Sequence, residues 1–240
     1  MPPIRKGDGT PVAPKGISQV RTGDGRILFD GPAIPDSEHY HPGNEGSGTL
    51  INDEIGGADL TLDKDNWRDV SDFEGGVGFE VNDGDNIGTV DIGTPSERTL
   101  IVRVFADSFH GGNQSNLWSY GGDGDPDLHY YEEVTDWRYD TPSDRLIVSE
   151  STWAGEIRIV ATRIDSSEAN LDVWEGDKSK VGDDAVSNPD TSYDNEGADF
   201  HLGEGEGGVR FWDGVIDPNM ITFNRRLSDS ELNDVIQEFF

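Results

Sequence analysis

The amino-acid sequence predicts an all-β protein: a two-sheet jelly-roll sandwich with a short C-terminal helix and an extended N-terminal arm. Three observations support this fold class. Apolar and polar residues alternate with a period of two in several short segments, clusters of glycine and aspartate separate these segments, and a convincing helical period occurs only near the C-terminus. Many short strands at fairly regular spacing are typical of sandwiches and jelly rolls.

Strands are predicted where the alternation is clearest, in segments 99–105, 145–148, 156–163 and 170–173. In the first of these segments, Leu100, Val102 and Val104 share one face of the strand. Loops are expected at the glycine- and aspartate-rich segments 82–85, 121–126 and 203–208.

One helix is predicted at the C-terminal end. Ser228 and Glu231 have the spacing of a capping box, with Ser228 as the N-cap residue. An apolar stripe with helical spacing follows, and we expect it to lie on a sheet; it consists of Leu232, Val235, Ile236 and Phe239.

The first 37 residues differ from the rest, so we predict an arm at 1–37 and one domain at 38–240. Residues 1–29 carry a net charge of +3, which leaves −34 for the other 211 residues. Six of the twelve prolines occur by Pro35, and the one strand-like stretch is 27–29. A basic, extended arm is suited to docking on an acidic partner. The docking residues that we predict are Arg5, Lys6, Lys15, Arg21 and Arg26.

The composition limits the classes of function. With 49 acidic against 18 basic residues and a net charge of −31, the surface repels nucleic acid. The absence of cysteine excludes disulfides, thiolate metal sites and cysteine nucleophiles. The longest aliphatic run, 100–102, is too short to span a bilayer, and the N-terminal residues do not resemble a secretory signal. A charge this negative favours a protein of an extreme halophile or of a virus that infects one, because molar salt screens the self-repulsion.

Several motifs resemble laminin-G-like domains, which belong to the concanavalin-A-like jelly rolls. The strand 211–217 followed by the segment 221–232 resembles the closing strand and helix of that family. Residues 75–79 and the hairpin 158–177 resemble two of its internal motifs. The resemblance covers residues 40–240 and implies an adhesion module whose common cofactor is calcium. The family's ligand site does not transfer, because Trp174-Glu175 and Pro218-Asn219 depart from its pattern.

Candidate ligand-binding residues surround the aspartate-rich loop. Lectin-like sites stack sugars on aromatic rings and hydrogen-bond them with Asp or Asn. The sugar-binding residues that we predict are Trp118, Tyr120, Asp123, Asp125, Tyr130 and Trp137, although most aromatic residues of such a sandwich belong to its core.

Asp123, Asp125 and Asp127 are also the candidate ligands for calcium. In a chain this rich in aspartate, a single Asp-x-Asp-x-Asp match arises readily by chance and carries little information. We therefore predict no required cofactor and keep calcium as the candidate ion.

No catalytic residues are predicted. The Glu-x-Asp-x-x-Glu pattern of related glycosidases does not occur, and we interpret Glu204 and Glu206 as solvated loop residues. His39 and His41 lack an evident third metal ligand, and they are expected on a surface at the entry to the domain.

The sequence therefore predicts a non-enzymatic virion protein of a halophilic archaeal virus. The arm would contact other virion proteins, and the domain would decorate the capsid or tail as a homo-oligomer and contact host glycans. The alternatives are a carbohydrate-binding or adhesion protein on the surface of a haloarchaeon and, third, a glycosidase relative.

Overall fold

The computed structural model describes the greater part of the chain. The described residues are 19–21, 27–30, 37–41, 46–53, 55–73, 76–81, 87–93, 96–109, 114–120, 127–131, 133–151, 153–191, 200–204 and 211–240, with the backbone alone at 19–21, 27–30, 114 and 120. The chain divides into two compact units, residues 1–36 and residues 37–240.

The first unit contains a strand pair that the sequence indicated only in part. Strand β2 (Ile27–Asp30) was expected, but β1 (Gln19–Arg21), which pairs with it antiparallel, was not. The pairing of β1 with β2 is therefore an addition to the predicted arm. Arg21 ends β1, whereas Arg5, Lys6, Lys15 and Arg26 lie outside the described residues, so the docking role of these side chains stays a prediction.

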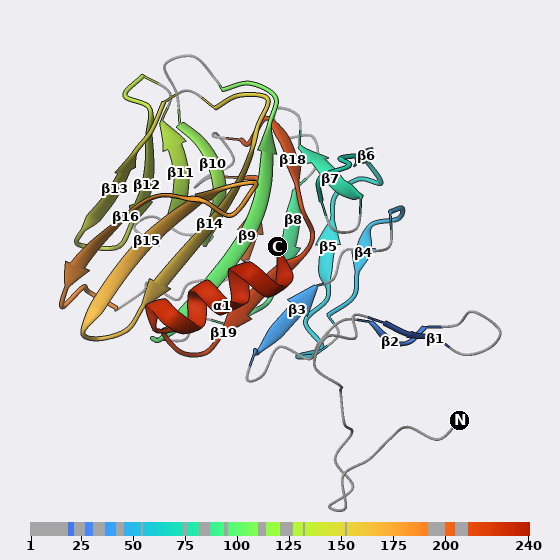
Figure 1. The fold of residues 1–240 in the computed structure, drawn as a ribbon, viewed down its shortest axis with the longest axis horizontal. Coiled ribbons are helices and arrows are strands. Elements are labelled where there is room, and N and C mark those ends of the chain that lie inside the picture. The colour runs from blue at the N-terminus through green and yellow to red at the C-terminus, as the bar shows by residue number, and fades with distance from the viewer. Residues whose placement is uncertain are drawn as a thin grey trace, which may run out of the picture. The chain divides into compact units, whose positions relative to one another are not determined.

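The second unit is a sandwich of two antiparallel sheets, as predicted (Figure 1). In the described part of the chain, the first sheet has eight strands. Their spatial order is β13 (Arg145–Ser149), β12 (Asp136–Asp140), β11 (Asp127–Tyr131), β10 (Gln114–Tyr120), β17 (Phe200–Leu202), β8 (Gly88–Val90), β5 (Leu60–Leu62) and β4 (Leu50–Ile51).

The second sheet has nine strands within the described residues. Seven of them run in the order β16 (Lys180–Ser187), β15 (Glu168–Glu175), β14 (Ile157–Ile164), β9 (Arg98–Ala106), β18 (Gly214–Ile216), β7 (Val77–Val81) and β6 (Trp67–Asp69). The other two are β19 (Met220–Phe223), which pairs with β9, and β3 (His39–His41), which pairs with β19.

The core lies between the sheets, and the predicted alternation supplies it. Leu100, Val102 and Val104 of β9 belong to one buried cluster with Leu146 and Val148 of β13. Because side chains of a strand point alternately to its two faces, the neighbours of these residues face outward. The predicted strands at 99–105, 145–148, 156–163 and 170–173 are all confirmed.

Strand β9 is shared by two successive partners, β18 and then β19. The closest approach is at Gly214, which has a φ of +150°; a Cβ there would lie 2.1 Å from the carbonyl oxygen of Phe105. Only glycine fits at this point, so Gly214 allows β18 to lie against β9.

Helix α1 (Asp229–Phe239) covers the outer face of the nine-stranded sheet, where Figure 1 shows it in front of β9 and β14. The predicted capping box between Ser228 and Glu231 is present. The four residues of the predicted apolar stripe are buried, which confirms that this side of the helix packs on the protein.

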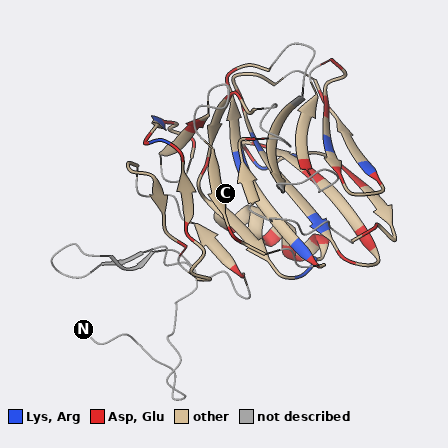
Figure 2. Cartoon of the chain, turned by 180° about the vertical axis from the view of Figure 1, so that it is seen from behind, with Lys and Arg blue, Asp and Glu red and all other residues tan. Residues whose placement is uncertain are grey.

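Charged residues occur in the strands and loops of both sheets, with Asp and Glu outnumbering Lys and Arg (Figure 2). None of the described helical residues forms a segment long and apolar enough to cross a membrane.

Candidate functional site: the outer polar face of the eight-stranded sheet

Three of the predicted sugar-binding residues are part of the core. Trp118 is 2% exposed, and Tyr130 and Trp137 are 0% exposed. No ring face of these residues is open to a sugar, so the stacking role predicted for them is corrected. The side chain of Tyr120 lies outside the described residues, as do Asp123 and Asp125.

The opposite side of the same strands carries polar side chains. Leu128 and Tyr130 of β11 face the core, so Asp127 and His129 point away from it. The strand register places Asn116, His129 and Arg138 side by side, and it also aligns Asp127, Asp140 and Arg145. We name these six residues the outer polar face.

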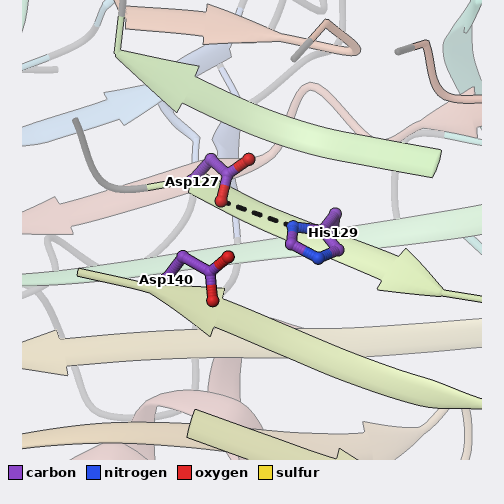
Figure 3. A group of neighbouring side chains, drawn as sticks. All are labelled: Asp127, His129 and Asp140. Carbon is purple, nitrogen blue, oxygen red and sulfur yellow. Dashed lines mark ion pairs between the residues drawn. The ribbon is translucent and has the colours of Figure 1, made fainter. Parts of the chain in front are cut away.

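Two carboxylates and an imidazole meet at the centre of this face (Figure 3). One potential ligand atom from each of Asp127, His129 and Asp140 lies within 4.8 Å of the others. His129 Nδ1 and Asp127 Oδ1 lie 3.3 Å apart.

Each carboxylate is held by its own donor. Asn116 Nδ2 donates to Asp127 Oδ2 at 2.8 Å. Arg145 binds both oxygens of Asp140, through Nε at 2.6 Å and Nη2 at 2.7 Å. Hydrogen bonding to Asp140 raises the pKa of Arg145.

Several buried polar atoms of this face have no hydrogen-bond partner within the described structure. They are Asn116 Oδ1, both ring nitrogens of His129 and Arg138 Nε. The exposed fraction of the side chain rises across the face, from 1% for His129 through 15% for Arg138 to 49% for Arg145. The face therefore opens to solvent on the side of β13.

A histidine–glutamate pair lies on the same side of the sheet. His201 of β17 is paired in register with Ser119, and its Nδ1 is 3.2 Å from Glu204 Oε2. Glu204 is only 16% exposed and forms an isolated β-bridge with Phe211, so the interpretation of Glu204 as a solvated loop residue is wrong. Glu206 lies outside the described residues.

The His39–His41 pair is buried, which corrects its expected place on a surface. His39 is 7% exposed and His41 is 0% exposed. His39 Nδ1 lies 2.5 Å from Asp53 Oδ2, and the carboxylate of Asp53 also accepts hydrogen bonds from backbone amides that include those of Tyr40 and Ala58. Burial lowers the pKa of His41, whose Nε2 lies 2.8 Å from the carbonyl oxygen of Ala58. These contacts fix the loop that follows β4.

The lowered pKa of Asp53 predicts that the folded protein loses stability in acid. Burial would raise the pKa of this carboxyl, but the hydrogen bonds from His39 and the backbone outweigh it and hold the pKa well below its usual range. The folded state therefore binds fewer protons than the unfolded state, and the stabilisation is present above about pH 4 and lost as the pH falls. In urea unfolding, Asp53→Asn should cost about 1.5–3 kcal/mol at pH 7 and progressively less in acid.

A matched control for this substitution is Asp69→Asn, because Asp69 is exposed in β6. We expect it to change the unfolding free energy by less than about 0.5 kcal/mol. A cost of Asp53→Asn that stayed constant down to pH 3 would contradict a lowered pKa of Asp53 in the folded protein.

The described cluster fits calcium poorly. Calcium takes six to eight oxygen ligands, whereas Asp127, His129 and Asp140 offer two carboxylates and a nitrogen. A calcium site that combines Asp127 with Asp123 and Asp125 stays a prediction, because the last two lie outside the described residues.

Asp127 of this cluster was predicted as a ligand from the sequence, but its partners His129 and Asp140 were not. A usable signal was present in the segment Asp136–Asp140, where polar residues alternate with Trp137 and Tyr139. That alternation separates an aromatic core face from a polar outer face.

Comparisons with solved structures support the fold. Trypanosoma rangeli sialidase in complex with the inhibitor DANA matches with a TM-score of 0.57 and 15% identity, over 92% of this chain and 35% of the sialidase chain. Domain 4 of AbnA, a GH43 extracellular arabinanase from Geobacillus stearothermophilus, in complex with arabinotriose, matches with a TM-score of 0.56 and 14% identity, over 84% of this chain and 98% of that domain. The chain shares the fold of these β-sandwiches.

The present chain spans about a third of the length of the sialidase chains that it matches. Comparison with protein-family profiles finds no match, and comparison with curated protein sequences finds none at a significant level. The similarity to laminin-G-like domains therefore stays a resemblance in sequence motifs.

Proposed function

We propose that the domain is a non-catalytic carbohydrate-binding module and that its outer polar face binds the sugar. The observation that carries this proposal is the row formed by Asn116, His129 and Arg138, in which each side chain has a buried polar atom without a partner in the described structure. Sugar hydroxyls both donate and accept hydrogen bonds, so a sugar could satisfy these atoms. The fold shared with an arabinotriose-bound domain adds support.

Arg138 is the residue best placed for the first contact with a sugar. Its guanidinium lies 4.5 Å from the centre of the Tyr131 ring, and its side chain is 15% exposed, between buried His129 and exposed Arg145. The contact with the ring restricts the guanidinium, so less conformational entropy is lost when it binds a hydroxyl group.

Substitution of Arg138 by alanine tests the site. A charge-assisted hydrogen bond contributes about 1.5–3 kcal/mol, so Arg138→Ala should weaken glycan binding about 10- to 100-fold. Ligands would be found on an array that includes arabinan and sialylated glycans, and their affinity would then be measured by calorimetry.

The control for this substitution is Arg225→Ala, because Arg225 lies before α1 and is paired with exposed Glu231. This variant should bind the glycan like the unmodified protein. Equal affinity of Arg138→Ala and the unmodified protein would place any binding elsewhere, and an array without ligands would contradict the proposal as a whole.

The absence of catalysis is part of the proposal. The carboxylates of Asp127 and Asp140 are close, but each accepts hydrogen bonds from a neighbouring side chain, which suits a binding role. Release of reducing sugar from the bound glycan would instead support the glycosidase alternative.

A virion-surface role is the more specific form of the proposal. Its support is the acidic composition, together with the basic segment 1–29. Mass spectrometry of purified particles from haloarchaeal hosts tests it, and a cell-surface adhesin is the alternative.

A further inference from the structure

We propose that Asp127, His129 and Asp140 form a binding site for a divalent d-block cation such as zinc. The proposal rests on the donor atoms, on their spacing and on the buried imidazole. It does not depend on glycan binding.

The donor set suits such an ion. Zinc is bound by histidine nitrogen and carboxylate oxygen at about 2.0–2.2 Å, and three protein ligands plus one further position are common. Two tetrahedral ligands at that distance lie about 3.3 Å apart. The observed separation of His129 Nδ1 and Asp127 Oδ1 is 3.3 Å.

The imidazole of His129 is the second observation that indicates a ligand. Its side chain is 1% exposed, and neither ring nitrogen has a hydrogen-bond partner within the described structure. Figure 3 shows the Nδ1 side of the ring directed at Asp127, with Asp140 beside them. A cation bound at Nδ1 would satisfy that atom and leave Nε2 available for a hydrogen bond, as is usual for a metal-bound histidine.

The surroundings also favour a bound cation. Asp127 and Asp140 face each other across β11 and β12, and like charges in that position repel. Asn116 and Arg145 orient the two carboxylates as outer partners do in metal sites, although Arg145 also opposes the cation by its charge. A carboxylate has lone pairs beyond those that accept from Arg145, so Asp140 can still serve as a ligand.

Direct metal titration tests the site. The full chain, stripped with a chelator, would be titrated with Zn²⁺ by calorimetry and with Co²⁺ by visible absorption at constant salt. We expect one Zn²⁺ per chain and a Co²⁺ spectrum typical of a four- or five-coordinate site. His129→Gln and Asp127→Asn should each weaken Zn²⁺ binding at least about 100-fold.

His201→Gln is the matched control, because His201 also pairs with a carboxylate on this sheet. It should bind Zn²⁺ like the unmodified chain, and circular dichroism would show that all variants are folded. Absence of saturable Zn²⁺ binding overturns the proposal, as does unchanged binding by both folded site variants or displacement of Zn²⁺ by equimolar Ca²⁺. Since no sugar is present, the result is independent of the proposed function.

Discussion

Replacing Asp217 with alanine is expected to lower the free energy of unfolding by about 3–5 kcal/mol. Asp217 Oδ2 accepts from Arg103 Nε at 2.6 Å and lies 2.5 Å from Arg103 Nη2, and both side chains are 2% exposed. Removal of the carboxylate leaves the buried guanidinium without its side-chain ion-pair partner.

This ion pair also holds the end of α1 on the sheet. Arg103 Nη1 donates to the main-chain oxygen of Phe240 at 2.7 Å, and Asn219 Nδ2 donates to the carbonyl oxygen of Phe239 at 3.0 Å. Burial raises the pKa of Asp217 despite the attraction of Arg103, so desolvation offsets much of the benefit of this pair. The expected loss in Asp217→Ala therefore reflects the orphaned arginine more than the net strength of the pair.

A double variant separates these two contributions. Arg103→Met combined with Asp217→Leu removes both charges and keeps apolar volume, and it should recover most of the lost stability. As a control, Arg225→Ala breaks the exposed pair with Glu231 and should cost less than about 1 kcal/mol. Urea unfolding at constant salt gives the free energy of unfolding of the unmodified protein and of the three variants. A double variant as unstable as Asp217→Ala would contradict the orphaned-charge explanation.

The sequence was sufficient for those parts of the fold that depend on local patterns. The capping box at Ser228 and Glu231 and the alternation in 99–105 are local signals, and the structure confirms both. The pairing of β9 with β18 depends on close approach at Gly214, which only the assembled sheet reveals.

The candidate site was harder to predict, because aromatic and acidic residues serve both cores and binding sites. Trp137 follows an aspartate-rich loop in the sequence, but strand alternation turns its ring inward. His129 and Asp140 are eleven residues apart, and only the register of β11 and β12 brings them together. The sequence also does not show that His39 is buried or that its ring forms a hydrogen bond with Asp53.

Trp137→Ala is expected to lower the free energy of unfolding by about 3–5 kcal/mol. The indole of Trp137 stacks on Trp153 with ring centres 5.3 Å apart and on Trp212 at 6.0 Å, and its Nε1 donates to Glu150 Oε2 at 2.8 Å. The substitution leaves a cavity between the sheets and removes a donor from a carboxylate that is 4% exposed.

The control for Trp137→Ala is Ile147→Ala on the adjacent strand. Ile147 is 39% exposed on the opposite side of the sheet, so this change should cost less than about 0.5 kcal/mol. Trp137→Phe should have an intermediate cost, because it keeps an aromatic ring in the core but loses the bond to Glu150. Near-UV circular dichroism should report the loss of the stacked indoles, and urea unfolding gives the free energies.

Glycan binding by the same variant separates a core role from a sugar-stacking role. The ring of Trp137 lies on the core side of β12, whereas Arg138 lies on the outer polar face. At a temperature where Trp137→Ala remains folded, its affinity for a glycan ligand should therefore stay within about threefold of that of the unmodified protein. A folded Trp137→Ala protein with normal stability and no affinity would instead make this tryptophan a sugar contact.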